Sequence, residues 1–265
     1  MRIGVIISTY NNPTWLEKTL WGYLCQQRMA DEIVIADDGS APDTRQMVMQ
    51  YAHQLPIKYV WHDDLGFRKT KILNEALRVA ESEYLVFTDQ DCVPRNDFLS
   101  THERCARKGH FLSGGCVRLP MAVSQRITHD DIVTQRAFNL RWLREDGLTL
   151  SFKNCKLLQS RWFAQTMNAV TPTKATWNGG NASGWRSDLL AARGFDERLR
   201  YGGEDRELGE RLINAGLRGI QVRYSAIVLH LDHSRPYVDA DALAHNDSIR
   251  RQTRQSKATT TQFGL

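Results

Sequence analysis

Two aspartates one residue apart, Asp89 and Asp91, follow directly after the apolar run at residues 84–87. A short continuous apolar run of this kind predicts a strand that is buried on both faces of a sheet. Open α/β sheets bind their ligands at the carboxyl ends of the strands. Carboxylate oxygens suit Mg²⁺ or Mn²⁺, which usually bridge to substrate phosphates. The pair therefore predicts a divalent-metal site; the alternative is a solvated turn that caps the next helix.

The elements that must position this pair form a repeating pattern. Three helical patterns, at residues 15–24, 43–52 and 70–80, alternate with four apolar strand-like runs, at residues 3–7, 33–36, 57–61 and 84–87. Such repeated strand–helix units predict a mostly parallel sheet with helices on both faces.

The second half of the chain is less regular. Helices are expected at 98–108, 130–144, 188–193 and 204–215, and strands at 111–117 and 219–229. The region up to residue 176 is basic and rich in aromatic residues, without strand periodicity. From residue 240 the chain is polar and basic, which predicts either a docked helix or a disordered tail.

Composition limits the class of protein. The chain has 265 residues, a formal net charge of +5 and a pI of about 9.0. This charge favours an anionic partner: a nucleotide diphosphate, a nucleic acid or an anionic membrane surface. The five cysteines are odd in number and form no C-x-x-C pair, so a reducing cytoplasm is expected. With neither a signal-peptide pattern nor a long apolar stretch, we expect a cytoplasmic protein, at most peripheral at the inner face of the membrane.

Four motifs follow one another at expected strand ends: DDGS at 37–40, GFR at 66–68, DQD at 89–91 and GGED at 202–205. Together with STYN at 8–11 and LNEA at 73–76, they resemble the family 2 nucleotide-sugar glycosyltransferases of the GT-A fold. The part from 178 to 205 is similar to β1,4-galactosyltransferases and bacterial chondroitin polymerase domains. The resemblance spans residues 3–233 and is weakest between 119 and 176.

The resemblance implies an α/β GT-A (Rossmann-like) fold with a mostly parallel central sheet flanked by helices and a helical acceptor-side insertion. The expected organisation is a donor-binding half at 1–118, an acceptor-binding and catalytic half of the same domain at 119–235, and a basic C-terminal helix or tail at 236–265.

The implied donor site binds a nucleotide-diphosphate sugar, and a UDP-sugar is the expected donor. Its residues are Thr9, Tyr10, Asp37, Arg68, Asn74 and Asp89. Asp37 would orient the base and Arg68 the diphosphate, since cations stabilise both a bound and a departing diphosphate. A solvated helix face accounts for Lys69 and Lys71 equally well.

The implied metal ligands are Asp91, His230 and His233, and the implied ion is Mn²⁺ or Mg²⁺. The two histidines resemble the Met-x-x-His pair of the galactosyltransferases with histidine in the first position. Imidazole is an accepted ligand for such ions, although a structural role for each histidine is the alternative.

By the same resemblance Asp205 is the general base that takes the proton of an acceptor hydroxyl. The implied acceptor site consists of Trp177, Asn178, Asn181, Tyr201 and Glu204. Asp205 and Glu204 also fit the first turn of a helix, where the helix dipole alone favours acidic residues.

The resemblance thus implies an inverting, metal-dependent glycosyltransferase that moves a hexose or N-acetylhexosamine from a UDP-sugar to a hydroxyl of a bacterial-type cell-surface glycan, such as lipopolysaccharide, O-antigen or capsule. A nucleotidyltransferase is the first alternative, but the segment at 8–13 is not a glycine-rich phosphate loop. A non-catalytic basic module that binds glycan or nucleic acid is the second. The strand-end carboxylates oppose nucleic-acid binding because phosphate backbones repel them.

Overall fold

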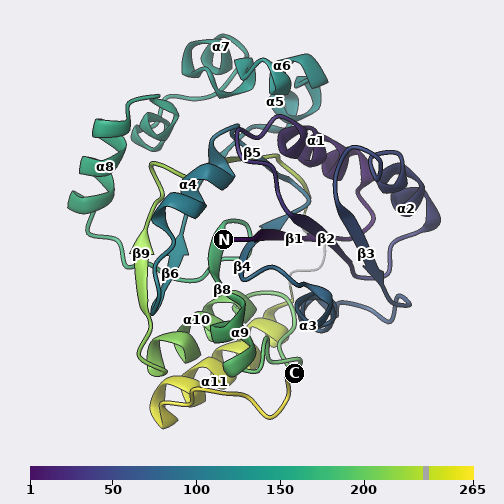
Figure 1. Ribbon diagram of the computed structural model, residues 1–265, viewed down its shortest axis with the longest axis vertical. Helices are drawn as coiled ribbons and strands as arrows, with labels where there is room; N and C mark the ends of the chain where they lie inside the picture. Colours follow the sequence, from purple (N-terminus) through teal and green to yellow (C-terminus); the bar gives the residue numbers. More distant parts are fainter. Residues whose placement is uncertain (235–238) are drawn as a thin grey trace.

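A seven-stranded sheet forms the centre of the computed structural model, which describes residues 1–234 and 239–265 (Figure 1). Its strand order is β3 (Ile57–Trp61), β2 (Glu32–Asp37), β1 (Ile3–Thr9), β4 (Tyr84–Asp89), β8 (Ala182–Trp185), β6 (His110–Ser113) and β9 (Arg218–Gln221). The first four strands are mutually parallel, and only β8 runs against its neighbours. The prediction of an α/β fold with a mostly parallel sheet is confirmed.

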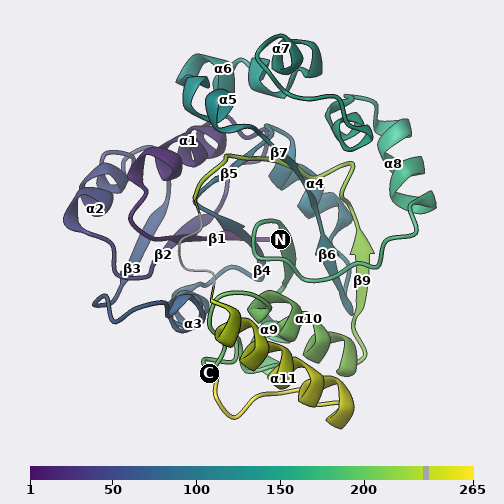
Figure 2. The same cartoon turned by 180° about the vertical axis from the view of Figure 1, so that it is seen from behind.

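Helices cover both faces of this sheet (Figures 1 and 2). One face packs on α1 (Pro13–Leu24), α2 (Pro42–Met49) and α4 (Phe98–Cys105), and the other on α3 (Lys69–Val79), α9 (Arg186–Ala191) and α10 (Glu204–Asn214). The sequence of α1 explains why it forms and packs on the sheet. Asn12 caps it, a proline occupies its first turn, and Leu16, Leu20 and Tyr23 lie on one buried stripe. The strands are therefore buried on both faces, as continuous apolar runs predict.

A second, three-stranded sheet carries a smaller helical layer. It consists of β5 (Cys92–Pro94), β10 (Ile227–His230) and β7 (Gly115–Arg118). The layer over it contains α5 (Met121–Arg126), α6 (His129–Val133) and α7 (Leu140–Glu145), and α8 (Arg161–Val170) follows along the outside of the molecule.

The expected single helix at 130–144 is wrong. The chain leaves α6 through Gln135, whose φ of 62° is incompatible with a continuing helix, and restarts at α7 with Asn139 as its cap. The expected strand at 219–229 is also wrong, because β9 and β10 belong to different sheets and a turn separates them. The strand expected at 111–117 is likewise divided into β6 and β7.

The C-terminal stretch is a docked helix, α11 (Ala240–Ser256), which packs against α10. Asn246 donates from Nδ2 to the carbonyl oxygens of Arg200, Tyr201 and Gly202, and Thr253 donates to Glu207 on α10. The helix thereby fixes the loop that leads into α10. The expected boundary between residues 235 and 236 lies outside the described residues.

Strand register brings the sequence motifs to one edge of the large sheet. Ser8 pairs with Asp89, and Thr9 pairs with Asp37, so the carboxyl ends of β1, β2 and β4 are level with one another. None of the helices in the described part of the chain is both long enough and apolar enough to cross a lipid bilayer.

Candidate active site

A cavity of about 660 Å³ opens at this edge of the sheet, within the size range of small-molecule sites. Its wall is formed by residues 8–12, Asp38, residues 66, 67 and 69, residues 89–91, Arg118, Tyr201 and residues 230, 233 and 234. Segments from both halves of the chain therefore meet at the strand ends, where ligands of α/β sheets bind.

Gln90, between the two aspartates, joins β4 to the loop after β1. Its Oε1 accepts hydrogen bonds from Oγ1 of Thr9, at 2.6 Å, and from the backbone N–H of Tyr10, at 3.0 Å. The Tyr10 hydroxyl donates to Asp64 at 2.9 Å, which extends the network to the loop between β3 and α3. Sequence reasoning did not single out Gln90; its position between Asp89 and Asp91 was the only signal.

Asp91 and two histidines form a candidate metal centre. Oδ2 of Asp91 lies 2.8 Å from Nε2 of His233 and 3.6 Å from Nε2 of His230, and the two imidazoles stack with centroids 5.7 Å apart. Burial would raise the pKa of Asp91, but the hydrogen bond from His233 and the charge of both rings hold it below its usual value. Both imidazoles thus approach the same oxygen of an ionised carboxylate, and the ligand atoms of Asp91, Cys92 and His230 lie within 4.8 Å of one another.

Cys92 also lies near this carboxylate, with Sγ 3.4 Å from Oδ1 of Asp91. Burial, reinforced by the charges of Asp91 and Asp89, raises the pKa of the Cys92 thiol well above its usual value. Because the thiolate is the form that binds metal, this side chain is a poor ligand. The carboxylate of Asp91 fits a hard divalent ion, and the two imidazoles beside it are less preferred but accepted ligands.

Lys69 connects the aspartate pair to α10. Its Nζ lies 2.7 Å from Oδ1 of Asp89, which also accepts from the Ser8 hydroxyl at 2.6 Å. Burial would lower the pKa of Lys69, but the charges of Asp89, Asp205 and Glu204 raise it well above its usual value. The ammonium group therefore stays charged in the cavity wall.

Asp205 stands in the first turn of α10, after two glycines whose left-handed φ values of 94° and 106° turn the chain sharply into the helix. The backbone N–H of Gly179 donates to its carboxylate, while Oδ1 is shielded from solvent and has no hydrogen-bond partner among the described residues. Burial and the charge of Glu204 raise the pKa of Asp205 to about 7, although Lys69 opposes the shift. Such a carboxylate is suited to accept a proton near neutral pH.

Close packing holds Asp205 and Asp89 near the same glycine pair. A Cβ on Gly179 would lie 2.7 and 2.8 Å from the Asp205 oxygens, and one on Gly180 would lie 3.3 Å from Oδ2 of Asp89. The structure thus brings the two acidic motifs together, as the sequence predicts.

The predicted base-binding residue, Asp37, does not line the cavity. It is fully buried, accepts from the backbone N–H of Ser40 at 2.8 Å and contacts the Tyr59 hydroxyl. Asp38 lines the cavity instead, 2.7 Å from Nε2 of His62. Successive side chains of a strand point in opposite directions, and here the second of the two neighbouring carboxylates faces the cavity.

Arg68 is placed differently from the expectation as well. Its backbone N–H donates to Oδ2 of Asp38 at 3.0 Å, and its guanidinium contacts the carbonyl of Asp63. Arg68 does not line the cavity, whereas Lys69 does. The cation that contacts Asp89 is therefore the lysine.

Three further predicted residues support the fold from within the core. Asn74 is fully buried and bonds both backbone groups of Phe195. Trp177 is also fully buried and packs edge-on against Phe87, so it has no exposed face for a sugar. Asn181, 1% exposed, donates to backbone carbonyls of β7 and of the residue before β10.

The other predicted acceptor residues remain close to the site. Tyr201 lines the cavity and packs edge-on against Phe67, with ring centroids 5.9 Å apart. Glu204 is buried and accepts from the backbone N–H of Gly202 at 2.9 Å. Asn178, half-buried, donates to the carbonyl of Asn181.

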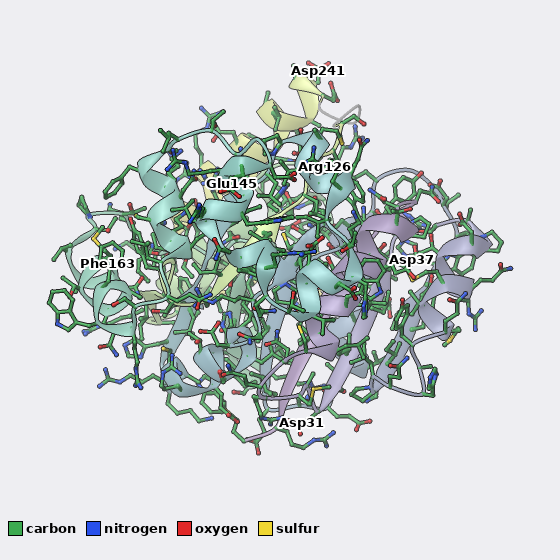
Figure 3. The ribbon with its side chains drawn as sticks, turned by 90° about the horizontal axis from the view of Figure 1, so that it is seen from above. Asp31, Asp37, Arg126, Glu145, Phe163 and Asp241 are labelled. Carbon is green, nitrogen blue, oxygen red and sulfur yellow. The ribbon has the colours of Figure 1, made fainter. Side chains whose placement is uncertain are left out.

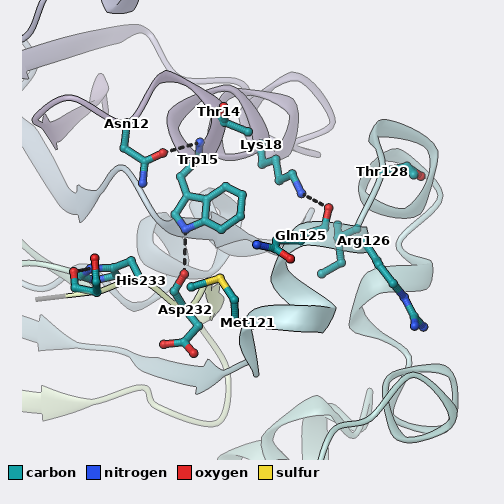
Figure 4. Close-up of a pocket in the computed structure, with 12 residues that line it drawn as sticks. Asn12, Thr14, Trp15, Lys18, Met121, Gln125, Arg126, Thr128, Asp232 and His233 are labelled. Atoms are coloured by element: carbon teal, nitrogen blue, oxygen red, sulfur yellow. Dashed lines mark hydrogen bonds between the residues drawn. The ribbon is translucent and has the colours of Figure 1, made fainter.

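A second cavity of about 580 Å³ adjoins the first and shares Asn12, His233 and Ser234 with it (Figure 4). Trp15 forms part of its wall and donates from Nε1 to the carbonyl of Asp232 at 3.0 Å. The site therefore has room for a second ligand beside the first.

The glycosyl transferase family 2 model matches residues 4–171 of the chain. Among similar curated proteins, validoxylamine A glucosyltransferase of Streptomyces hygroscopicus subsp. limoneus is 29% identical over 81% of this chain and 48% of its own length. Chondroitin synthase of Escherichia coli is 28% identical over 81% of this chain and 32% of its own length. The chain thus spans about half, or less, of the length of these relatives.

Solved structures with the same fold include TarS 1-349 of S. aureus in complex with UDP-GlcNAc. Its TM-score is 0.62 at 18% identity, over 97% of this chain and 72% of that one. The mannosyltransferase PcManGT of Pyrobaculum calidifontis, in complex with GDP-Man and Mn²⁺, has a TM-score of 0.58 at 22% identity, over 97% of this chain and 62% of that one. These likenesses confirm the GT-A fold expected from the motifs.

Proposed function

This chain belongs to glycosyl transferase family 2, and from that premise we propose that it is an inverting, metal-dependent transferase whose general base is Asp205. The observation that carries the proposal is the convergence of two distant acidic motifs on Lys69: Asp89, in the cavity wall, contacts its ammonium group, and Asp205, which does not itself line the cavity, lies close enough to raise its pKa. A phosphate-binding module would not gather carboxylates at this edge unless a cation or a proton transfer required them.

In the proposed reaction the diphosphate of a nucleotide sugar lies beside Lys69, whose ammonium group stabilises its charge as it leaves. Asp205 accepts the proton of the acceptor hydroxyl as that oxygen attacks the anomeric carbon. The attacking oxygen and the leaving diphosphate lie on opposite faces of the sugar. One displacement therefore inverts the configuration and converts an α-linked donor into a β-linked product.

The residues that would hold the divalent ion are Asp91, His230 and His233, and the close approach of both imidazoles to one carboxylate oxygen supports this assignment. When bound, Mn²⁺ or Mg²⁺ would neutralise the charge of the leaving diphosphate. Asp89 would act beside them on the ribose or on water bound to the ion, held by Ser8 and Lys69.

The base of the nucleotide is assigned to the pocket around Asp38, which accepts from His62 and from the Arg68 backbone. Thr9 and Tyr10 line the same cavity and complete the donor side. Asp37 would then support this loop from behind.

We propose a UDP-sugar as the donor and a hydroxyl of a bacterial-type cell-surface glycan as the acceptor, such as lipopolysaccharide, O-antigen or capsule. The similarity to a chondroitin synthase and to a structure that holds UDP-GlcNAc supports a hexose or N-acetylhexosamine. All five cysteines are unpaired, which suits a reducing cytoplasm and an enzyme that works there or at the inner face of the membrane.

A donor-hydrolysis screen tests the proposal. The purified chain is incubated with UDP-glucose, UDP-galactose, UDP-GlcNAc, UDP-GalNAc and GDP-mannose, each with Mn²⁺, with Mg²⁺ or with EDTA, and released nucleotide is measured. We expect slow hydrolysis of one or two UDP-sugars that EDTA abolishes. Hydrolysis that is unchanged by EDTA would contradict the metal dependence, and preferential hydrolysis of GDP-mannose would contradict the UDP assignment.

The pKa of Asp205 predicts a pH profile. Because a base must be deprotonated, we expect kcat/KM to rise about tenfold per pH unit below pH 7 and to level off above it. Lys69→Met removes the charge that favours the ionised form, so the midpoint should move to higher pH. Lys71→Met, on the same helix, is the matched control and should leave the midpoint unchanged. A Lys69→Met profile that coincides with the wild type would contradict the coupling.

A further inference from the structure

The most exposed apolar side chains of the described residues gather in one segment, residues 149–174. Five large apolar side chains are more than 60% exposed, and four of them lie here: Leu150, Phe152, Trp162 and Val170. On α8 only Ala164 is buried, so most of this helix faces outward. Exposed aromatic and aliphatic side chains in such density indicate an interaction surface.

The charge of the same segment has one sign. Residues 149–174 contain Lys153, Lys156, Arg161 and Lys174 but none of the chain's 30 acidic residues. Three of these four cations are exposed. Tryptophan, phenylalanine and leucine beside lysine and arginine are the composition of segments that lie at the interface of an anionic bilayer.

A cationic cavity of about 370 Å³ adjoins this surface at the start of α8. Arg95, Arg104 and Arg161 line it, against a single carboxylate, Asp97, which pairs with Arg95 through Nε and Nη2. Arg95 is only 8% exposed, and its Nη1 has no hydrogen-bond partner among the described residues. A buried guanidinium nitrogen with unused donors suits the oxygens of an anion.

Two helices add to the attraction for an anion. The cavity wall includes the first turn of α4, at Ser100, and the first turn of α8, at Arg161. Backbone N–H groups and the positive end of the helix dipole make a helix start favourable for negative charge. Cations, helix starts and exposed apolar side chains therefore occur together on one side of the molecule.

We propose that residues 149–174 dock on an anionic phospholipid bilayer, with Phe152 and Trp162 in the interface and a lipid phosphate in the cavity of Arg95, Arg104 and Arg161. This surface is remote from the donor site: Phe163 of α8 and Asp37 of β2 lie at opposite sides of the molecule (Figure 3). The chain can thus lie on a bilayer while its donor cavity stays accessible. This docking is independent of the proposed chemistry.

Vesicle sedimentation of the full chain tests the docking. Vesicles contain either phosphatidylcholine alone or phosphatidylcholine with phosphatidylglycerol. We expect the wild type to bind the anionic vesicles at least tenfold more tightly, with an affinity that falls as salt rises. Phe152→Ser/Trp162→Ser should lose at least tenfold in affinity for them, and so should Arg104→Glu/Arg161→Glu.

Met49→Ser is the matched control, because Met49 is 42% exposed on α2, across the molecule from α8 (Figure 1). It should bind vesicles like the wild type, and all variants should keep the thermal midpoint and the donor hydrolysis of the wild type. Trp162→Phe should in addition reduce the quenching of tryptophan fluorescence by brominated acyl chains.

Three outcomes would overturn the inference. The first is a wild type that binds neither kind of vesicle, and the second is a pair of double variants that bind as tightly as Met49→Ser. In the third, light scattering shows that the wild type is a dimer and that Phe152→Ser/Trp162→Ser is a monomer, while vesicle binding is unchanged. That result would assign the surface to a second copy of the chain.

Discussion

Asp205→Asn is expected to reduce sugar transfer by a factor on the order of 10²–10⁴, equivalent to about 3–5 kcal/mol of barrier, while the affinity for the nucleotide remains. The amide keeps the size of the side chain and can still accept from the Gly179 N–H, but it cannot take a proton at neutral pH. The loss should therefore appear in kcat rather than in donor binding. Initial transfer rates and isothermal titration with UDP measure the two quantities separately.

Asp247→Asn is the control for this change, because Asp247 is an exposed residue of α11 that pairs with Arg251. It should transfer sugar at the wild-type rate. Wild-type transfer by Asp205→Asn would exclude Asp205 as the base. A variant that instead loses its affinity for UDP would show that the carboxylate holds the donor, with proton transfer assigned elsewhere.

The strands and their edge could be predicted from sequence because buried parallel strands are continuous apolar runs, and chemistry-bearing residues follow them directly. The run at 84–87 became β4, and Asp89 and Asp91 lie at the cavity as expected. The helix at 130–144 could not be predicted in the same way. Its apolar residues have helical spacing, but the left-handed backbone of Gln135 and the extended backbone of Asn139 interrupt it.

The site was predicted to the level of motifs but not of individual side chains. Sequence favoured Asp37 over Asp38 and Arg68 over Lys69, whereas the structure places the second member of each pair at the cavity. Which of two neighbouring residues faces the cavity depends on the direction of one side chain at the end of an element. Neither periodicity nor residue type predicts this direction.

Burial determines which motif residues can contact a ligand, and motifs alone do not predict it. Trp177 and Asn181 belong to the motif region that resembles an acceptor site, yet they are 0% and 1% exposed. They flank the glycines at 179 and 180, which pack against Asp205 and Asp89, and the Asn181 carbonyl accepts from Asn178 across this turn. A residue within a motif can therefore act by shaping the loop that reaches the site. It need not contact a ligand itself.

Asp91→Ala is expected to abolish the metal-dependent part of donor binding. The change removes the one carboxylate that both imidazoles approach and leaves His230 and His233 without their shared acceptor. Loss of a charged ligand to a hard divalent ion should weaken UDP binding in Mn²⁺ by about tenfold or more, equivalent to about 1.4 kcal/mol for each factor of ten. Isothermal titration of UDP in Mn²⁺ and in EDTA measures this difference.

The wild type in EDTA and Asp91→Ala in Mn²⁺ should then have similar affinities for UDP, because in both cases the contribution of the bound metal ion is missing. His233→Gln should show the same loss in part, while His110→Gln, on β6 and outside both cavities beside the strand ends, should behave as the wild type. If Asp91→Ala keeps the full enhancement by Mn²⁺, the ion binds elsewhere. Lys69 would then be the principal group of this chain that stabilises the diphosphate, since its ammonium stays charged beside Asp89 whether or not an ion is present.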